Sequence, residues 1–215
     1  MVEWFEFTKA TGYVGVFTMM ALESTIVPIP SEIIVPPAAY YASRGELSMT
    51  GVVLAGGLGS TFGSSACYWL TYALGRPFVA RWGRYFLLPP ERLALAEKWL
   101  EDFALPGVFL ARLLPVVRHL IGFPAGLVRV PFWKFAGVTF VGSTLWTGVL
   151  AWYGARVLGK PENANLLTDP EGLVRMLKHD LLWFVGAVVV LGALWMGVKI
   201  YARRALAEVT PETSP

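Results

Sequence analysis

Two hydrophobic stretches are interrupted near their middles, the first by Glu23-Ser-Thr-Ile-Val-Pro28-Ile-Pro30-Ser-Glu32 and the second by Arg112-Leu-Leu-Pro115-Val-Val-Arg118. Pro28, Pro30 and Pro115 remove backbone donors and stop a continuous helix at these points. Each flanking arm is about half the length of a membrane-spanning helix. The arms comprise residues 10–22, 33–43, 103–111 and 119–128. Because unwound backbone at membrane depth must be covered by protein or water, we predict two re-entrant helical hairpins with facing tips.

The composition is that of a membrane protein without a separate soluble domain. Of the 215 residues, 55% are hydrophobic and 15% are charged, and the formal net charge is +3. Uncharged runs long enough to cross a bilayer lie at residues 51–75, 135–155 and 181–198. We therefore predict an all-α polytopic membrane protein with a single membrane domain, residues 1–215. Its parts would be a core at 12–160, an accessory transmembrane helix at 180–202 and a disordered tail at 205–215.

The order of these segments predicts the topology. Pro89-Pro90-Glu91-Arg92 opens a segment with apolar residues on one helical face, which predicts an amphipathic helix along the interface between the hairpins. A hairpin returns to its own side of the membrane, whereas a crossing changes sides. Two hairpins, each followed by a transmembrane helix, therefore predict an inverted repeat, with one more transmembrane helix at the C-terminal end. Lys and Arg are more numerous on the side reached after the first crossing, which favours a cytoplasmic C-terminus.

Four charged side chains stand at the predicted hairpin tips: Glu23, Glu32, Arg112 and Arg118. An unpaired charge at the centre of a membrane helix costs about 3 kcal/mol on insertion scales, so these groups must be paired, hydrated or protonated. One interpretation is a pair of structural salt bridges that fasten the hairpins together. Another is a polar pocket that holds an anion, since the guanidinium fork fits a phosphate. A salt bridge that opens when the anion arrives would combine the two.

Other classes of site find less support in the residues. No Lys/Arg cluster interleaved with aromatic residues indicates a nucleic-acid surface. A single cysteine, Cys67, excludes a disulfide or thiolate metal site within one chain, and no metal or cofactor is expected. His119 is a secondary candidate as a proton carrier or phosphate ligand, but a phospho-histidine phosphatase would need a second His and an orienting Asp. The Gly59-x3-Gly63 ladder predicts close helix packing.

These residues resemble the DedA family, also called SNARE-associated or VTT-domain proteins, over about residues 12–160. The segments that carry the resemblance are Glu-x4-Pro-x-Pro-x-Glu at 23–32, Gly59 to Tyr68 with Gly75-Arg76 after it, and Arg112-x2-Pro115-x2-Arg118 followed by Pro124-Ala125-Gly126 and Phe135. The family pattern Gly-x3-Met-x4-Phe is present as Gly126-x3-Val130-x4-Phe135, so valine stands where the family has methionine.

The resemblance implies a multi-pass protein of the bacterial inner membrane with facing re-entrant hairpins and a link to lipid translocation. Bacterial members are implicated in returning undecaprenyl phosphate to the cytoplasmic face, and eukaryotic relatives look like phospholipid scramblases. The family's functional acidic and arginine residues map by motif onto Glu23, Glu32, Arg112 and Arg118. Gly126, within the motif, is a secondary candidate.

The leading hypothesis is a lipid translocase, not an enzyme, that moves undecaprenyl phosphate or a related anionic lipid such as a phospholipid. Arg112 and Arg118 would hold the head group, while Glu23 and Glu32 compete for the arginines or carry coupling protons. Sodium is the other candidate ion, and a homodimer is a candidate assembly. Three rivals remain open: a proton-coupled ion or drug exporter, an intramembrane lipid phosphatase and a structural membrane scaffold.

Overall fold

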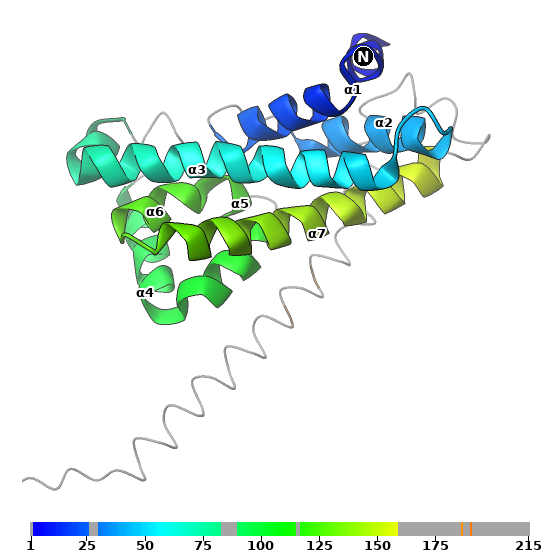
Figure 1. Cartoon of the computed structure of the whole chain (residues 1–215). Helices are drawn as coiled ribbons and strands as arrows, with labels where there is room; N and C mark the ends of the chain where they lie inside the picture. Colours follow the sequence, from blue (N-terminus) through cyan, green and yellow to red (C-terminus); the bar gives the residue numbers. More distant parts are fainter. Residues whose placement is uncertain are drawn as a thin grey trace, which may run out of the picture. The chain divides into compact units, whose positions relative to one another are not determined.

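A computed structural model of the chain describes residues 2–25, 30–82, 90–114 and 117–158, together with the single positions 186 and 190. The chain divides into two compact units, residues 1–177 and 178–215. All regular structure in the described residues is helical, and the helices belong to the first unit (Figure 1). They are α1 (Val2–Glu23), α2 (Ser31–Ser43), α3 (Met49–Trp82), α4 (Pro90–Arg112), α5 (Val117–Leu120), α6 (Gly122–Leu127) and α7 (Phe132–Leu158).

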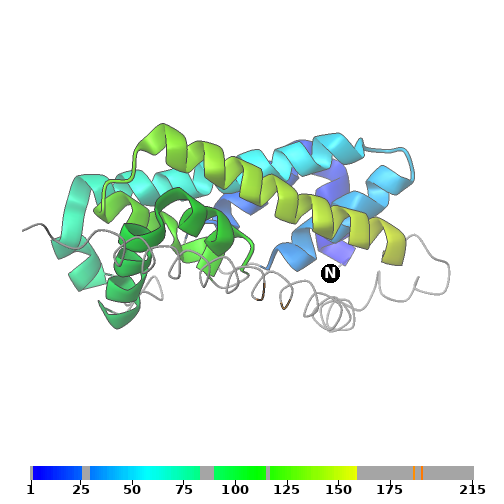
Figure 2. The same ribbon diagram turned by 90° about the horizontal axis from the view of Figure 1, so that it is seen from below.

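The two long helices α3 and α7 form the centre of this unit. They pack against each other and run in opposite directions, as Figures 1 and 2 both show. Helix α3 also packs against α1 and α6, whereas α7 packs against α2 and α4. The pair α1–α2 and the group α4–α6 are therefore both held by the same two long helices.

Glycines let the helices approach α3 closely. A Cβ at Gly63 would overlap the carbonyl oxygen of Ala21 on α1, and a Cβ at Gly59 would overlap that of Phe17 one turn earlier. A Cβ at Gly56 would come within 2.6 Å of Thr147 on α7. Small residues at such spacings allow backbone-to-backbone packing in membrane helices. The prediction that this ladder serves helix packing is confirmed.

Two glycines break the helices that contain them. Gly12 has a φ of 54° inside α1, and Gly75 has a φ of 66° inside α3. Glycine adopts these left-handed angles without the steric cost that a Cβ brings. The part of α1 after Gly12 is about 16 Å long at 1.5 Å per residue, half the thickness of a bilayer core. The straight part of α3 ends at Gly75, where the predicted crossing at 51–75 also ends.

The segment expected to hold an interfacial helix and a separate hairpin arm is one helix instead. α4 begins at Pro90, as expected, and continues to Arg112 with Pro106 in its interior. The interfacial helix and the hairpin arm that were expected to meet at Phe103 are therefore parts of one helix, whose interior proline lies three residues past Phe103. Figure 1 shows that α4 changes direction along its length, as an interior proline requires when its ring displaces the carbonyl of the preceding turn.

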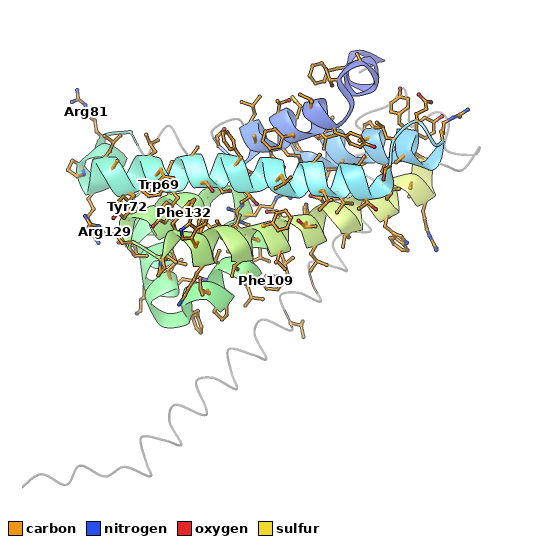
Figure 3. The ribbon with its side chains drawn as sticks, in the orientation of Figure 1. Trp69, Tyr72, Arg81, Phe109, Arg129 and Phe132 are labelled. Carbon is orange, nitrogen blue, oxygen red and sulfur yellow. The ribbon has the colours of Figure 1, made fainter. Side chains whose placement is uncertain are left out.

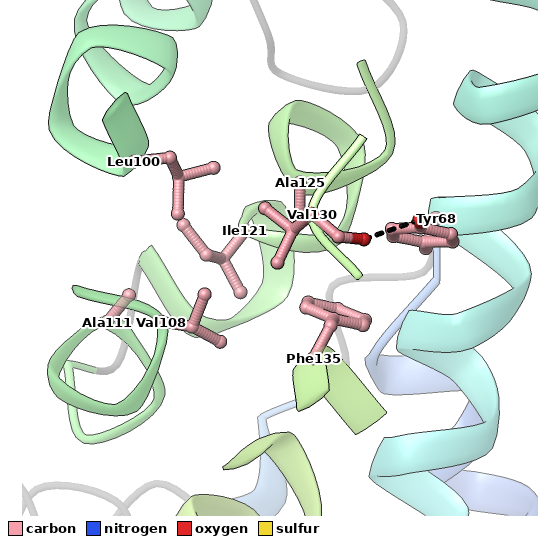
Figure 4. Packing of buried hydrophobic residues seen from close by; sticks show 8 residues of the cluster. All are labelled: Tyr68, Leu100, Val108, Ala111, Ile121, Ala125, Val130 and Phe135. Atoms are coloured by element: carbon pink, nitrogen blue, oxygen red, sulfur yellow. Dashed lines mark hydrogen bonds between the residues drawn. The ribbon is translucent and has the colours of Figure 1, made fainter. Parts of the chain in front are cut away.

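A hydrophobic cluster joins α3, α4, α6 and α7 (Figure 4). Its centre is Phe135, which is fully buried and stacks on Tyr68 with ring centroids 5.2 Å apart. The Tyr68 hydroxyl donates a hydrogen bond of 2.6 Å to the carbonyl of Val130. The motif positions Val130 and Phe135 therefore pack the turn between α6 and α7 against α3.

Among the described helices, α7 is long and apolar enough to cross a membrane by length and composition. The expected crossing at 51–75 lies within α3, where glycine, serine and threonine lower the mean hydropathy while permitting close packing. The expected crossing at 181–198, the accessory helix at 180–202 and the tail at 205–215 lie outside the described residues, apart from the two single positions. Their expected roles stay predictions.

Gly63→Ala tests the packing of α1 on α3. The added methyl group would overlap the Ala21 carbonyl, and such overpacking lowers the free energy of unfolding by about 1–3 kcal/mol. Gly137→Ala on α7 is the control, because a Cβ there meets nothing within 4 Å and alanine favours a helix. Unfolding titrations in mixed micelles should give Gly63→Ala a clearly lower free energy of unfolding than Gly137→Ala. Equal free energies would contradict the close packing of α1 on α3.

Candidate functional site: a buried arginine cluster

The predicted hairpin tips meet at a buried ion pair. Arg118 on the short helix α5 donates through Nη2 to Oε1 of Glu23, the last residue of α1. Glu23 is 2% exposed and Arg118 is 6% exposed. A buried pair of this kind is tolerable only when its remaining donors and acceptors find partners. Residues 95 positions apart in the sequence are thus joined at the centre of the unit.

Ser31 supplies hydrogen-bond partners to both members of the Glu23–Arg118 ion pair. Its backbone N–H donates to Glu23 Oε1 at 2.7 Å, and its hydroxyl oxygen accepts from Arg118 Nη2 at 2.6 Å. Ser31 is the first residue of α2, and no side-chain cap precedes it at Pro30. The Glu23 carboxylate therefore satisfies one of the free N–H groups at the start of α2 and lies at the positive end of its dipole.

Trp146 connects this group to α7. Its indole Nε1 donates to the Ser31 hydroxyl at 3.4 Å, and the Arg118 guanidinium lies over its ring, 5.0 Å from the centroid. A desolvated cation over a tryptophan face is stabilised by about 2 kcal/mol. Trp146 is itself buried and stands near the middle of α7. The end of α1, the start of α2 and helix α5 are therefore held at the midpoint of a helix long enough to span a membrane.

Arg112 is buried beside the pair without an acidic partner among the described residues. It is 2% exposed, and its Nη1 donates to the carbonyl of Arg118 at 2.8 Å. Gly142 on α7 makes room for it, because a Cβ there would lie 2.8 Å from Arg112 Cβ. Arg112 Nε and Nη2 and Arg118 Nε have no hydrogen-bond partner in the described structure. Three buried guanidinium nitrogens thus remain available to an anion.

The other predicted site residues differ in their placement. Glu32 is half-buried, and no hydrogen bond or ion pair links it to the described residues. His119 lies next to Arg118, and its Nδ1 has no partner in the described structure. A Cβ at Gly126 would overlap the Tyr68 carbonyl on α3, so Gly126 serves helix packing. Pro30 directly precedes α2, whereas Pro28 and Pro115 lie outside the described residues.

Two residues of the cluster were missed by sequence reasoning. Ser31 had a usable signal, since a small polar residue directly after a proline and before a glutamate is typical of a helix start. Trp146 had none, because it stands in an apolar run in which several other tryptophans and phenylalanines would serve equally well.

Metal chemistry finds no support in the described part of the chain, where no group of three or more His, Cys, Asp or Glu side chains could hold an ion. The cluster instead contains two arginines and one carboxylate, an excess of positive charge. In a medium of low dielectric constant such an excess favours a bound anion. Arginine forks bind phosphate and carboxylate oxygens in pairs of parallel hydrogen bonds.

Comparison with known proteins agrees with these features. A family model described as the VTT domain matches residues 29–156, which include Ser31, both arginines and Trp146. This chain belongs to the VTT-domain (DedA) family. The resemblance predicted from the sequence motifs is thereby confirmed, and relatives in this family are named membrane proteins.

Two relatives from Bacillus subtilis cover most of the VTT domain. The uncharacterized membrane protein YkoX is 33% identical over 157 residues, 73% of this chain and 69% of that protein. Undecaprenyl phosphate transporter A is 34% identical over 146 residues, 68% of this chain and 72% of that protein. Undecaprenyl phosphate transporter A of Staphylococcus aureus is 25% identical over 203 residues, 93% of this chain and 95% of that protein. No solved structure matches the chain.

Separate substitutions of Glu23 and Glu32 should distinguish the buried, ion-paired acid from the half-buried one. Glu23→Gln leaves Arg118 buried without a counter-charge and should lower the free energy of unfolding by about 3 kcal/mol. Glu32→Gln should change it by less than about 0.5 kcal/mol, because Glu32 is half-buried and has no described ion pair. Both variants can be unfolded in mixed micelles, and equal losses would contradict the placement of Glu23 at the centre of the site.

A double-mutant cycle tests the link between Ser31 and Trp146. Trp146→Phe keeps an aromatic face for Arg118 but removes the indole donor, which should cost about 1 kcal/mol. Ser31→Ala removes the shared acceptor, so the double variant should lose about 1 kcal/mol less stability than the sum of the two single losses. Additive losses would mean that the two side chains act independently. Trp152→Phe, on the exposed side of α7, is the matched control.

Proposed function

We propose that this VTT-domain protein moves an anionic lipid head group across the bacterial cytoplasmic membrane, with undecaprenyl phosphate or a related polyprenyl phosphate as the substrate. The supporting observation is the buried cluster of two arginines and one carboxylate, in which three guanidinium nitrogens lack partners among the described residues. The names of the Bacillus subtilis and Staphylococcus aureus relatives support the same class of substrate.

The exchange of partners at Arg118 gives the cluster a mechanism. A phosphate entering the site meets the free nitrogens of Arg112 first, since these have no acceptor to release. It then competes with Glu23 for Arg118, because a guanidinium binds phosphate and carboxylate in the same bidentate manner. The head group thus replaces the internal carboxylate, while the apolar tail stays in the lipid. Return of Glu23 to Arg118 expels the head group on the other side.

The same exchange accounts for coupling to protons. When phosphate takes Arg118, the Glu23 carboxylate loses its buried counter-charge and keeps the hydrogen bond from the Ser31 backbone. A proton or a sodium ion would then compensate its charge, since an isolated buried carboxylate is costly. We assign this role to Glu23 first and to the half-buried Glu32 second.

The membrane arrangement in this proposal follows the two arms of each hairpin. The part of α1 after Gly12 and the whole of α2 are each too short to cross, whereas α7 is long enough. The two hairpins would enter from opposite faces, with α3 and α7 as the antiparallel crossings of an inverted repeat. Rocking of one hairpin against the other would expose the cluster to each leaflet in turn, with the C-terminus in the cytoplasm.

Transport by vesicles containing the purified full chain tests this function. A fluorescent polyprenyl phosphate placed in the outer leaflet should reach the inner leaflet faster than in empty vesicles. Arg118→Ala should abolish the acceleration, and Arg112→Gln, which strands no carboxylate, should reduce it about 10- to 100-fold through the loss of charge-assisted hydrogen bonds.

Arg156→Gln is the control, because Arg156 is exposed at the end of α7 and lies over Trp152 instead of the cluster. Its transport rate should match that of the wild type. The proposed function fails if wild-type and Arg112→Gln vesicles move the lipid at the same rate, or if the chain releases inorganic phosphate from the lipid instead of moving it.

A further inference from the structure

Arg129 is held in a backbone conformation that an arginine rarely adopts. Its φ is 54°, and it is the one non-glycine residue with a positive φ among the described residues. This left-handed region brings Cβ close to the backbone and is normally occupied by glycine or asparagine. Such an outlier persists only where the surroundings enforce it, and it points to a task for the side chain.

The end of α6 enforces this conformation. The N–H of Arg129 donates to the carbonyl of Gly126 at 3.2 Å, and the N–H of Val130 donates to that of Ala125 at 3.0 Å. These two bonds form a Schellman motif, whose left-handed position most often carries glycine. The hydrogen bond from Tyr68 to Val130 fixes the next residue against α3. A glycine would satisfy this turn without strain, so the turn itself does not explain the arginine.

The Arg129 side chain lies against an aromatic surface at one end of α3 and α7. We call Trp69, Tyr72, Phe132 and Trp133 the aromatic rim. The guanidinium of Arg129 lies 5.3 Å from the centroid of the Tyr72 ring. Successive rings of the rim contact one another, with centroids 5.1–5.2 Å apart. Figure 3 shows Trp69, Tyr72 and Phe132 gathered beside Arg129 at this end of the two helices.

The rim is exposed and positively charged. Trp133 is 83% exposed, and Trp69, Tyr72 and Arg129 are also exposed. Lys134 adds a second exposed cation, and no ion pair joins either cation to a described acidic residue. Exposed Trp and Tyr rings lie at the head-group level of membranes, where basic residues meet lipid phosphates. Since α7 begins and the straight part of α3 ends here, the rim stands where both helices leave the bilayer.

Exposed apolar residues and an apolar groove lie farther along α7 from the rim. Trp133, Gly137, Val141 and Leu145 recur every four residues and share one exposed face of the helix. Farther along, a groove of about 580 Å³ is lined by Phe140, Val141, Thr144, Leu145, Gly148, Val149 and Trp152. A lipid with its phosphate at the rim could therefore lay an acyl chain in this groove.

We propose that the aromatic rim, with Arg129 as its phosphate-binding residue and the α7 groove as its chain-binding part, is a surface site for an anionic membrane lipid. Arg129 donates to the phosphate while Tyr72 backs the guanidinium through a cation–π contact. The left-handed backbone directs the arginine to this place. The site lies apart from the buried arginine cluster and does not depend on the transport proposed for it.

Arg129→Gly tests the site through two opposite effects. Glycine relieves the left-handed strain, so the melting temperature without lipid should rise. Phosphatidylglycerol added to the purified full chain should raise the wild-type melting temperature more than phosphatidylcholine does, because a ligand stabilises the folded state that binds it. In Arg129→Gly this difference between the two lipids should disappear, whereas Arg129→Lys should keep part of it.

Matched variants keep the test specific. Arg156→Gln removes an exposed arginine over Trp152 at the other end of α7 and should retain the lipid difference. Gly148→Leu fills the groove and should weaken the response to long-chain phosphatidylglycerol, leaving that to a short-chain form intact. The proposal is overturned if Arg129→Gly keeps the lipid difference, if it lowers the melting temperature, or if inorganic phosphate alone reproduces the shift.

Discussion

The buried pair of Glu23 and Arg118 is the interaction on which the rest of the unit depends. Two charges withdrawn from water are costly, and the cost falls only when every remaining donor and acceptor is engaged. Ser31 meets this condition for the carboxylate, and Trp146 covers the guanidinium face. The end of α1, the start of α2, helix α5 and the middle of α7 must therefore come together at one point for the chain to fold.

The Glu23–Arg118 pair leaves the positive charge of the second buried arginine, Arg112, without a counter-charge among the described residues. Glu23 compensates one of two buried arginines, and Arg112 reaches past Gly142 with two of its nitrogens unpaired in the described structure. A purely structural salt bridge would have no use for a second buried cation. In the proposed transport, the charge excess would raise the cost of the empty site and lower the cost of binding an anion, so stability and affinity would oppose each other at Arg112.

The sequence predicted the positions of the helix breaks and the charged residues but not their partners. Prolines and charges inside apolar stretches are local signals, so the C-terminal end of α1 and the start of α2 could be predicted, whereas the start of α1 at Val2 was not. Glu23 and Glu32 are equivalent in such a pattern, and only the folded helices decide that Glu23 is buried and Glu32 is half-buried. Ser31 and Trp146 act through contacts across 115 positions of sequence, which no local pattern encodes. The continuity of α4 through Pro106 was not predicted, because an interior proline more often ends a helix than bends it.

The glycines of α3 and α7 explain how so much charge can be held inside a small helical unit. At Gly63 and Gly142 no side chain competes for space, so α1 approaches α3 and Arg112 lies flat against α7. Both arginines are thereby buried among helices, as charges inside a membrane would require. The lower hydropathy of α3 follows from the same residues, whereas α7 is long and apolar enough to cross a membrane. Close packing and strong hydrophobicity are thus competing requirements on a helix sequence, and α3 of this chain meets the first.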